Sequence, residues 1–152
     1  MTINSFNTFD NIKEIMLGDV DHTVIDFCDP DQRPRLNHIF NKTKKELNQI
    51  QKIFESRDIK VHRPATIDKT QVRTPYWSSM GTKIPLTPRD VFLIMGNDVV
   101  ESAHWQKERM FETYHWRDLF ISKLESGARW HNMPLPRHDY ASLEVEFDDI
   151  VV

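Results

Sequence analysis

The stretch that decides the fold is Leu86-Thr87-Pro88-Arg89-Asp90-Val91-Phe92-Leu93-Ile94-Met95-Gly96-Asn97-Asp98-Val99-Val100-Glu101-Ser102. Residues 91–95 are apolar without a break, which is typical of a short strand buried on both faces. Gly96-Asn97-Asp98 then supply turn chemistry, because Gly and Asn tolerate a positive φ. Val99 and Val100 resume a strand, so the stretch predicts a tight β-hairpin.

Asp90 stands at the entrance to this hairpin, two positions after Pro88. Proline has no N–H to give to a sheet, so Pro88 restricts a strand here to its start or to an edge. A carboxylate fixed at the rim of a buried sheet can bind a cationic substrate, which makes Asp90 the candidate binding residue. On spacing alone, the other interpretation stays open: Asp90 caps a turn, or pairs with Arg89 or another surface base.

The composition predicts one globular domain over residues 1–152, with 39% hydrophobic and 28% charged residues. No apolar run approaches the ~20 residues that cross a bilayer, and the N-terminus lacks the features of a secretory signal, so we expect no membrane partner. Cys28 is the single cysteine, which excludes an internal disulfide and favours a reducing compartment. The cytoplasm is the expected location.

The net charge of −3 gives no global reason to expect nucleic acid as a partner. The charge is nevertheless uneven along the chain. Residues 33–63 hold nine Lys or Arg against three acids, and residues 139–149 hold five acids and no Lys or Arg. A basic patch can contact phosphate, but a solvated helix face is the favoured interpretation of residues 33–63.

The first half of the chain predicts a strand–helix–strand unit over roughly residues 7–64. Its first strand centres on residues 15–17 and is followed by a loop over residues 20–32. The helix carries one apolar stripe at 3- and 4-residue intervals, with Pro34 near its start and Asp29 or Asp31 as its cap. The stripe consists of Leu36, Ile39, Phe40, Thr43, Leu47, Ile50, Ile53 and Phe54. Residues 59–63 form the closing strand.

The second half predicts a related unit over roughly residues 86–134, after a loop at 65–85. A loop this long is usually functional or disordered, and we expect it to be functional because it leads the chain to Asp90. After the hairpin comes a helix over residues 103–126, with Ser102 as its cap and Gly127 as its stop. A third strand follows at 128–133. The end of the chain, residues 143–152, looks like the start of a further strand at which the chain has been cut.

Other candidate chemistry is weak. Glu108, Glu112 and His115 share one helical face, and Glu112 and His115 have the Glu-x-x-His spacing of di-iron bundles. Such sites need two of these motifs, so a solvated, ion-paired face is the favoured interpretation, and we expect no metal and no cofactor. Cys28 lies among Asp26, Asp29 and Asp31, and neighbouring carboxylates disfavour a nucleophilic thiolate. The sequence therefore contains no complete catalytic set.

The order of motifs nevertheless resembles that of the amidinotransferase family, typified by arginine:glycine and inosamine-phosphate amidinotransferases. The resemblance covers essentially the whole chain and is most specific from Pro88 to Pro136. The motifs are Pro88-Arg89-Asp90-Val91, Gly96-Asn97-Asp98-Val99-Val100-Glu101, Arg109-Met110-Phe111-Glu112, Gly127-Ala128-Arg129-Trp130 and Pro134-Leu135-Pro136.

The resemblance implies an α/β fold, namely a partial five-bladed propeller of the guanidine-modifying superfamily with about two of its five units. In that family a cysteine attacks the guanidinium carbon of arginine, and an acceptor amine then takes the amidino group. Asp90 matches the family's first guanidinium-binding Asp. The second carboxylate, the His and the nucleophilic Cys of the family come later than residue 152, so the resemblance implies no catalytic residue in this chain.

Two functions therefore stand side by side. In the first, the chain is the N-terminal part of an amidinotransferase that acts on arginine and an acceptor amine, inactive without a complementary C-terminal polypeptide. In the second, it is a non-enzymatic binding or assembly module derived from that fold. An unclosed propeller exposes strand edges, so both predict a partner, either that polypeptide or further copies in a homo-oligomer.

Overall fold

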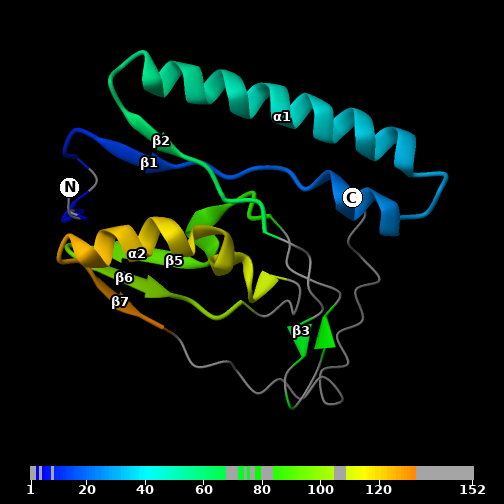
Figure 1. The fold of residues 1–152 in the computed structure, drawn as a ribbon. Coiled ribbons are helices and arrows are strands. Elements are labelled where there is room, and N and C mark those ends of the chain that lie inside the picture. The colour runs from blue at the N-terminus through cyan, green and yellow to red at the C-terminus, as the bar shows by residue number, and fades with distance from the viewer. Residues whose placement is uncertain are drawn as a thin grey trace.

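The computed structural model describes residues 3, 5–7, 9–67, 72–73, 75, 78–79, 84–104 and 109–132. Its elements follow the order strand, helix, strand, then hairpin, helix, strand, as the sequence predicts (Figure 1). They are β1 (Glu14–Met16), η1 (His22–Phe27), α1 (Arg33–Glu55), β2 (Lys60–His62), β3 (Val72–Arg73), β4 (Ser78–Ser79), η2 (Pro88–Asp90), β5 (Phe92–Met95), β6 (Asp98–Glu101), η4 (Glu112–Trp116), α2 (Arg117–Glu125) and β7 (Arg129–His131).

The first unit is a βαβ crossover, in which β1 and β2 pair in parallel and α1 connects them. Pro34 lies in the first turn of α1, where its missing N–H costs nothing. The predicted cap is wrong: Gln32 is the N-cap, and the Asp29 side chain instead accepts a hydrogen bond from the Asp31 N–H. The predicted loop before α1 also contains a short 3-10 helix, η1, begun by Asp21, whose carboxylate accepts from the Thr23 N–H.

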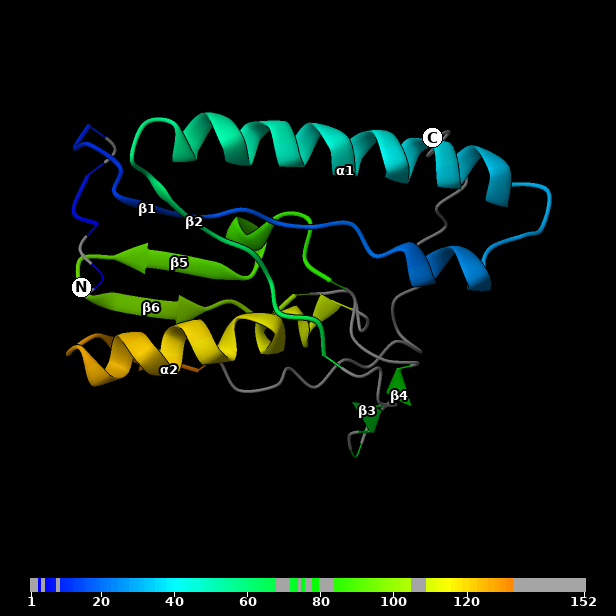
Figure 2. The same cartoon turned by 45° about the horizontal axis from the view of Figure 1, so that its top comes forward.

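The apolar stripe of α1 has the predicted spacing but is only partly covered. No residue of α1 is buried, and Ile39, Ile50 and Ile53 are exposed. Leu36 and Phe54 are half-buried. Both ribbon views place α1 on the side of β1 and β2 that faces away from α2, so this helix is an outer layer (Figures 1 and 2).

The second unit contains the predicted hairpin. Strands β5 and β6 pair antiparallel with Met95 opposite Asp98, which leaves Gly96 and Asn97 as the turn. Gly96 has φ +59°, the left-handed conformation that favours glycine. Strand β7 then pairs with β6 in parallel, so the sheet order is β5-β6-β7.

One prediction about this hairpin is wrong. Strand β5 is buried on one face only: Phe92 is buried, whereas Leu93 and Met95 are 57% and 63% exposed. Neighbouring side chains of a strand point to opposite faces, and among the described residues only the inner face of β5 is well covered. The unbroken apolar run therefore reports an uncovered apolar face rather than a doubly buried strand.

The prediction of one long second helix over residues 103–126 is also wrong. The structure has a 3-10 helix, η4, followed by α2 with only nine residues, and positions 105–108 lie outside the described residues. From Met110 to Trp116 every residue except Tyr114 is buried, which a single face of an α-helix cannot provide. Gly127 is the predicted stop, with φ +95° and its N–H donating to the Leu124 carbonyl.

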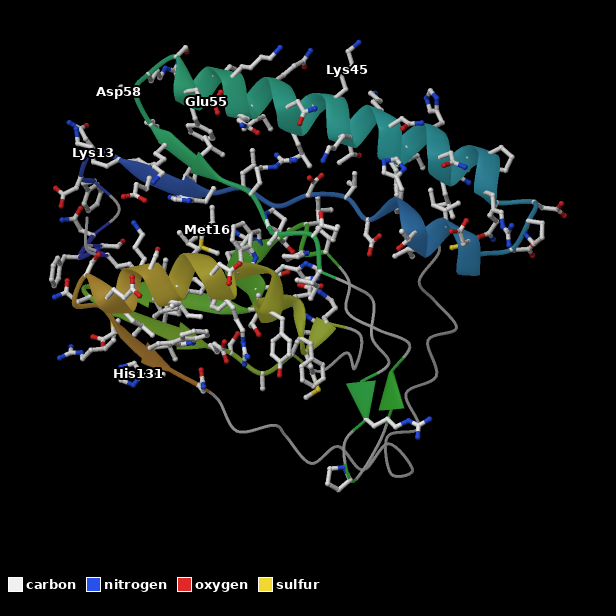
Figure 3. The ribbon with its side chains drawn as sticks, viewed as in Figure 1. Lys13, Met16, Lys45, Glu55, Asp58 and His131 are labelled. Carbon is white, nitrogen blue, oxygen red and sulfur yellow. The ribbon has the colours of Figure 1, made fainter. Side chains whose placement is uncertain are left out.

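The core lies between the β5-β6-β7 sheet and the helices that precede β7. It consists of Val91, Phe92, Val99, Trp116 and Phe120, with Ile3, Met16, Leu119 and Trp130 packed against it. The Phe120 ring lies 4.6 Å from the ring of Phe92 and 5.6 Å from that of Trp130, centroid to centroid. Figure 3 shows Met16 on the side of β1 that faces α2, so the first unit contributes to the same core.

Polar contacts tie the two units together as well. Glu14 on β1 accepts a hydrogen bond from Lys123 on α2 at 2.7 Å and contacts His62 on β2 at 2.6 Å. After β2, the Ala65 N–H donates to the His115 carbonyl, and His115 Nδ1 donates to the Ala65 carbonyl at 2.7 Å. These contacts make one α/β body of the two units.

The described residues form three small sheets, β1-β2, β3-β4 and β5-β6-β7, and these do not close into a propeller. The β3-β4 pair is a short antiparallel hairpin inside the predicted loop at 65–85. The final stretch, 143–152, lies outside the described residues. None of the helices described here is both long and apolar enough to span a membrane.

Candidate functional site

Asp90 ends the 3-10 turn η2, and one residue, Val91, separates it from β5. Its N–H donates to the Thr87 carbonyl, and its own carbonyl accepts a hydrogen bond from Ser102 Oγ at 2.9 Å. The sequence predicted that Ser102 caps a helix. In the structure its side chain instead anchors the Asp90 backbone across the hairpin. The result is a carboxylate held at the rim of the sheet on a fixed backbone.

The Asp90 carboxylate is engaged within the chain. Its Oδ2 accepts a hydrogen bond from Thr87 Oγ1 at 2.6 Å and another from Arg109 Nη2 at 3.1 Å. The Thr87 hydrogen bond, followed by the Arg109 guanidinium, lowers the pKa of Asp90. The arrangement realises the alternative that the sequence left open, in which Asp90 pairs with a nearby base.

The base that binds Asp90 is itself held by a second carboxylate. Arg109 Nε donates to Glu112 Oε1 at 2.7 Å, and Nη2 donates to Glu112 Oε2 at 3.0 Å. Such a two-point fork is the strongest common way to bind a guanidinium. Hydrogen bonding to Glu112 raises the pKa of Arg109, so the guanidinium is charged at every physiological pH. It therefore lies between two carboxylates.

His104 completes this group. Arg109 Nη1 lies 3.0 Å from His104 Nε2, and because an arginine can only donate, that nitrogen is the unprotonated acceptor. Burial, followed by the nearby Arg109 charge, lowers the pKa of His104. The five side chains of Thr87, Asp90, His104, Arg109 and Glu112 form what we call the Asp90 cluster.

The solvated helix face predicted for Glu112 and His115 is wrong. Glu112 is 2% exposed and His115 3%, and each is held by the contacts already described. Glu108, the third member of that group, lies outside the described residues. In the part of the chain that the structure describes, no three His, Cys, Asp or Glu side chains gather as a metal site would require.

Cys28 takes a local structural contact. It follows η1, and its Sγ donates to the Val24 carbonyl at 3.4 Å. The basic stretch lies mainly along the exposed face of α1, where Figure 3 shows Lys45 pointing away from the body. A shallow hollow of about 390 Å³ on this helix is lined only by its own polar residues: Asn41, Lys44, Lys45, Asn48, Gln49 and Lys52. None of them belongs to the Asp90 cluster.

Sequence reasoning chose Asp90 as the candidate binding residue, a role that stays a prediction, and did not pair it with Arg109. Arg109 and Glu112 stand in one of the family-like motifs, and their spacing of three residues was the available signal. That spacing gives no sign that Arg109 also binds Asp90, because the two residues are 19 positions apart and meet only in the folded chain. The cluster is thus a product of tertiary structure.

Comparison with known proteins identifies relatives. No protein-family model matches the chain. The L-arginine:L-lysine amidinotransferase of Pseudomonas savastanoi pv. phaseolicola is 30% identical over 150 residues, covering 87% of this chain and 41% of that protein. The mitochondrial glycine amidinotransferase of Danio rerio is 32% identical over 92 residues, covering 60% of this chain and 22% of that protein.

A solved structure agrees with these relatives. An amidinotransferase of the saxitoxin biosynthetic pathway from Microseira wollei superposes with a TM-score of 0.72 at 28% identity, over 89% of this chain and 42% of that one. The chain thus spans less than half the length of each of these three proteins. Over most of its own length, and as its order of motifs indicated, the chain is a homologue of the amidinotransferases.

Proposed function

We propose that this chain is the N-terminal part of an arginine-dependent amidinotransferase and that Asp90 binds the substrate guanidinium. The observation that carries the proposal is the Asp90 cluster, in which a guanidinium already lies between Asp90 and Glu112. Carboxylates that hold an internal guanidinium have the charge and hydrogen-bonding geometry that a substrate guanidinium needs. The name of the Pseudomonas relative, an L-arginine:L-lysine amidinotransferase, supports arginine as the donor.

The proposed chemistry needs groups beyond this chain. The amidinotransferase resemblance assigns the nucleophilic Cys, the catalytic His and the second substrate carboxylate to positions after residue 152. We therefore propose that residues 7–64 and 86–134 are about two of the five units of a propeller. A complementary polypeptide would supply the rest, and the chain alone would be inactive. Because Cys28 is a free thiol, which fits a reducing compartment, we place the protein in the cytoplasm.

The uncovered face of β5 favours a second candidate, a non-enzymatic binding or assembly module. Leu93 and Met95 expose apolar surface there, and such surface is normally covered by a partner. Both candidates expect a partner chain, or further copies of this one. They differ in whether the assembly releases ornithine from arginine.

The test is the mass of the native assembly, followed by an assay for ornithine formed from arginine in the presence of glycine or lysine. The proposal expects a co-purifying chain and ornithine release that Asp90→Asn reduces at least 100-fold, while Asp31→Asn, an exposed control, leaves it unchanged. If the 18.1 kDa chain is alone or self-associated and forms no ornithine, the enzyme proposal fails and the module remains.

A further inference from the structure

The Asp90 carboxylate is used asymmetrically. Its Oδ2 takes both hydrogen bonds, from Thr87 and from Arg109. Its Oδ1 lies 3.8 Å from Arg89 Nε, too far for a hydrogen bond, and the Arg89 side chain is 92% exposed. The Asp90 side chain is itself 34% exposed. Within the described residues, then, Oδ2 is fixed by two hydrogen bonds and Oδ1 takes none, on a side chain that is one-third exposed.

The charge of the cluster depends on Glu112. The Arg109 guanidinium lies 3.1 Å from Asp90 Oδ2, so on its own it would cancel the negative charge of Asp90. A cationic ligand at Asp90 would then be repelled by Arg109 without a net attraction from the carboxylate. Glu112 is buried and binds the same guanidinium at two points, which adds a second negative charge behind it. Within the cluster, two carboxylates and one guanidinium sum to a net charge of −1; Arg89 lies 3.8 Å from Oδ1, but its side chain is 92% exposed, so water screens its charge.

We propose that Glu112 and Arg109 are positioning residues for Asp90: Arg109 fixes Oδ2, and Glu112 offsets the Arg109 charge so that Oδ1 can bind one guanidinium. This inference rests on the proposed role of Asp90 and deepens it. Asp90 then binds the singly charged guanidinium of the ligand. Without Glu112, Asp90 binds that guanidinium poorly. Neither residue touches the ligand.

A simpler structural role makes a different prediction. If Glu112 only supports the fold around Arg109, removing both residues should damage the site more than removing one. If Glu112 offsets the charge of Arg109, removing both should restore the site, because the net charge returns to its native value. The double variant Glu112→Gln/Arg109→Gln separates the two roles.

Two measurements on the 152-residue chain test the inference. The first is the pKa of Asp90, from its carboxyl ¹³C shift against pH. The second is the affinity for L-arginine, from an NMR titration at pH 7, with uncharged citrulline as the control ligand. Glu112→Gln should lower the pKa of Asp90 further and weaken arginine binding about ten-fold, because the Arg109 charge is no longer offset.

The other variants complete the design. The double variant should return arginine affinity to within about three-fold of native, because Thr87 still donates to Oδ2 when Arg109 is gone. Glu112→Asp, which keeps the charge, should stay within the same range. Arg109→Gln should raise the pKa of Asp90, and it replaces Glu112→Gln if that variant does not fold. Glu46→Gln, an exposed acid on α1, is the matched control and should change neither quantity.

The outcomes are distinct. An Asp90 pKa that is the same in Glu112→Gln and in the native chain overturns the inference, as does a double variant that binds arginine no better than Glu112→Gln. A native chain that binds citrulline as tightly as arginine overturns the proposed role of Asp90; if it binds neither ligand, the pKa of Asp90 alone decides the inference. In that case a lowered Asp90 pKa in Glu112→Gln still supports the charge coupling between the two carboxylates.

Discussion

Glu14 and Lys123 form a 2.7 Å ion pair between β1 and α2, across 109 positions of sequence. The pair is partly buried, with side chains 20% and 13% exposed, and Glu14 also contacts His62. It is one of the polar links between the two units, beside the Ala65–His115 contacts. We therefore expect this ion pair to contribute to the free energy of unfolding.

Lys123→Met should therefore destabilise the chain by about 1 kcal/mol, because a partly buried charge-assisted hydrogen bond is lost while the apolar stem is kept. Urea unfolding measures the change. The matched control is Lys42→Met, whose 3.9 Å pair with Glu46 is exposed and should matter by less than about 0.5 kcal/mol. Equal losses in the two variants would mean that the Glu14–Lys123 pair adds nothing special.

Acid should destabilise the protein through carboxylates that are paired in the fold. Burial opposes ionisation of Glu14, but hydrogen bonds from Lys123 and His62 outweigh it and lower its pKa. Burial likewise opposes ionisation of Asp19, but hydrogen bonds from Lys44 and the Val20 N–H outweigh it and lower that pKa. A group with a lowered folded pKa stabilises the fold above its ordinary pKa and loses this contribution as the pH falls. The free energy of unfolding should therefore hold above about pH 5 and decline below it.

The matched test of this pH effect is Glu14→Gln. This variant should be less stable than native at pH 7, and the difference should shrink as the pH falls below the ordinary pKa of 4.5, because the unfolded chain then binds a proton that the folded Glu14 resists. Glu101 acts in the opposite sense, since burial raises its pKa. Glu101→Gln should therefore steepen the net loss of stability in acid. A stability difference for Glu14→Gln that does not vary with pH would contradict the assignment.

Two glycines should respond very differently to alanine. A Cβ on Gly18 would lie 1.9 Å from the Leu86 carbonyl oxygen, which is backbone, so Gly18→Ala should cost about 3 kcal/mol or more. Gly96 has φ +59°, and its added Cβ would meet only the exposed Phe6 ring, so Gly96→Ala should cost about 1 to 2 kcal/mol. Urea denaturation of both variants checks the order, and a reversal would contradict the close approach at Gly18.

The core and the outer helix should also differ in sensitivity. Phe120 is 2% exposed and touches two aromatic rings, so Phe120→Ala should cost about 3 to 5 kcal/mol. Ile53 on α1 is 50% exposed, and Ile53→Ala should change stability by less than about 0.5 kcal/mol. Thermal and urea unfolding measure both. A large loss for Ile53→Ala would mean that another surface covers this face in solution.

Local chemistry accounts for what the sequence predicted well. Hairpin, crossover helix and closing strands are set by residues close in sequence: the Gly96 turn, Pro34 at the start of α1, and Gly127 at the end of α2. These signals act over one turn or one strand, so they can be recognised without the fold. Asp90 was chosen as a candidate in the same way, from its place before the hairpin, and its binding role stays a prediction.

Burial and long-range pairing account for what the sequence missed. The apolar run of β5 does not reveal that Leu93 and Met95 are exposed, because periodicity reports apolar positions and not what covers them. The residues of η4 are buried almost consecutively, which overrides the helical pattern that their spacing suggested. The Arg109–Asp90 contact needs the hairpin and η4 to be brought together first.

The two parallel strand pairs set the order in which the chain can fold. Strands β5 and β6 meet through a two-residue turn, whereas Asp98 on β6 and Arg129 on β7 are 31 positions apart, and Glu14 and His62 are 48 apart. Closing a longer loop costs more chain entropy before any contact rewards it. On refolding of the full chain, loop closure therefore favours the hairpin that follows Asp90 as the first contact, ahead of both parallel pairs. In a nascent chain, by contrast, β1, α1 and β2 emerge before the hairpin does, so synthesis and refolding of the full chain begin at opposite units.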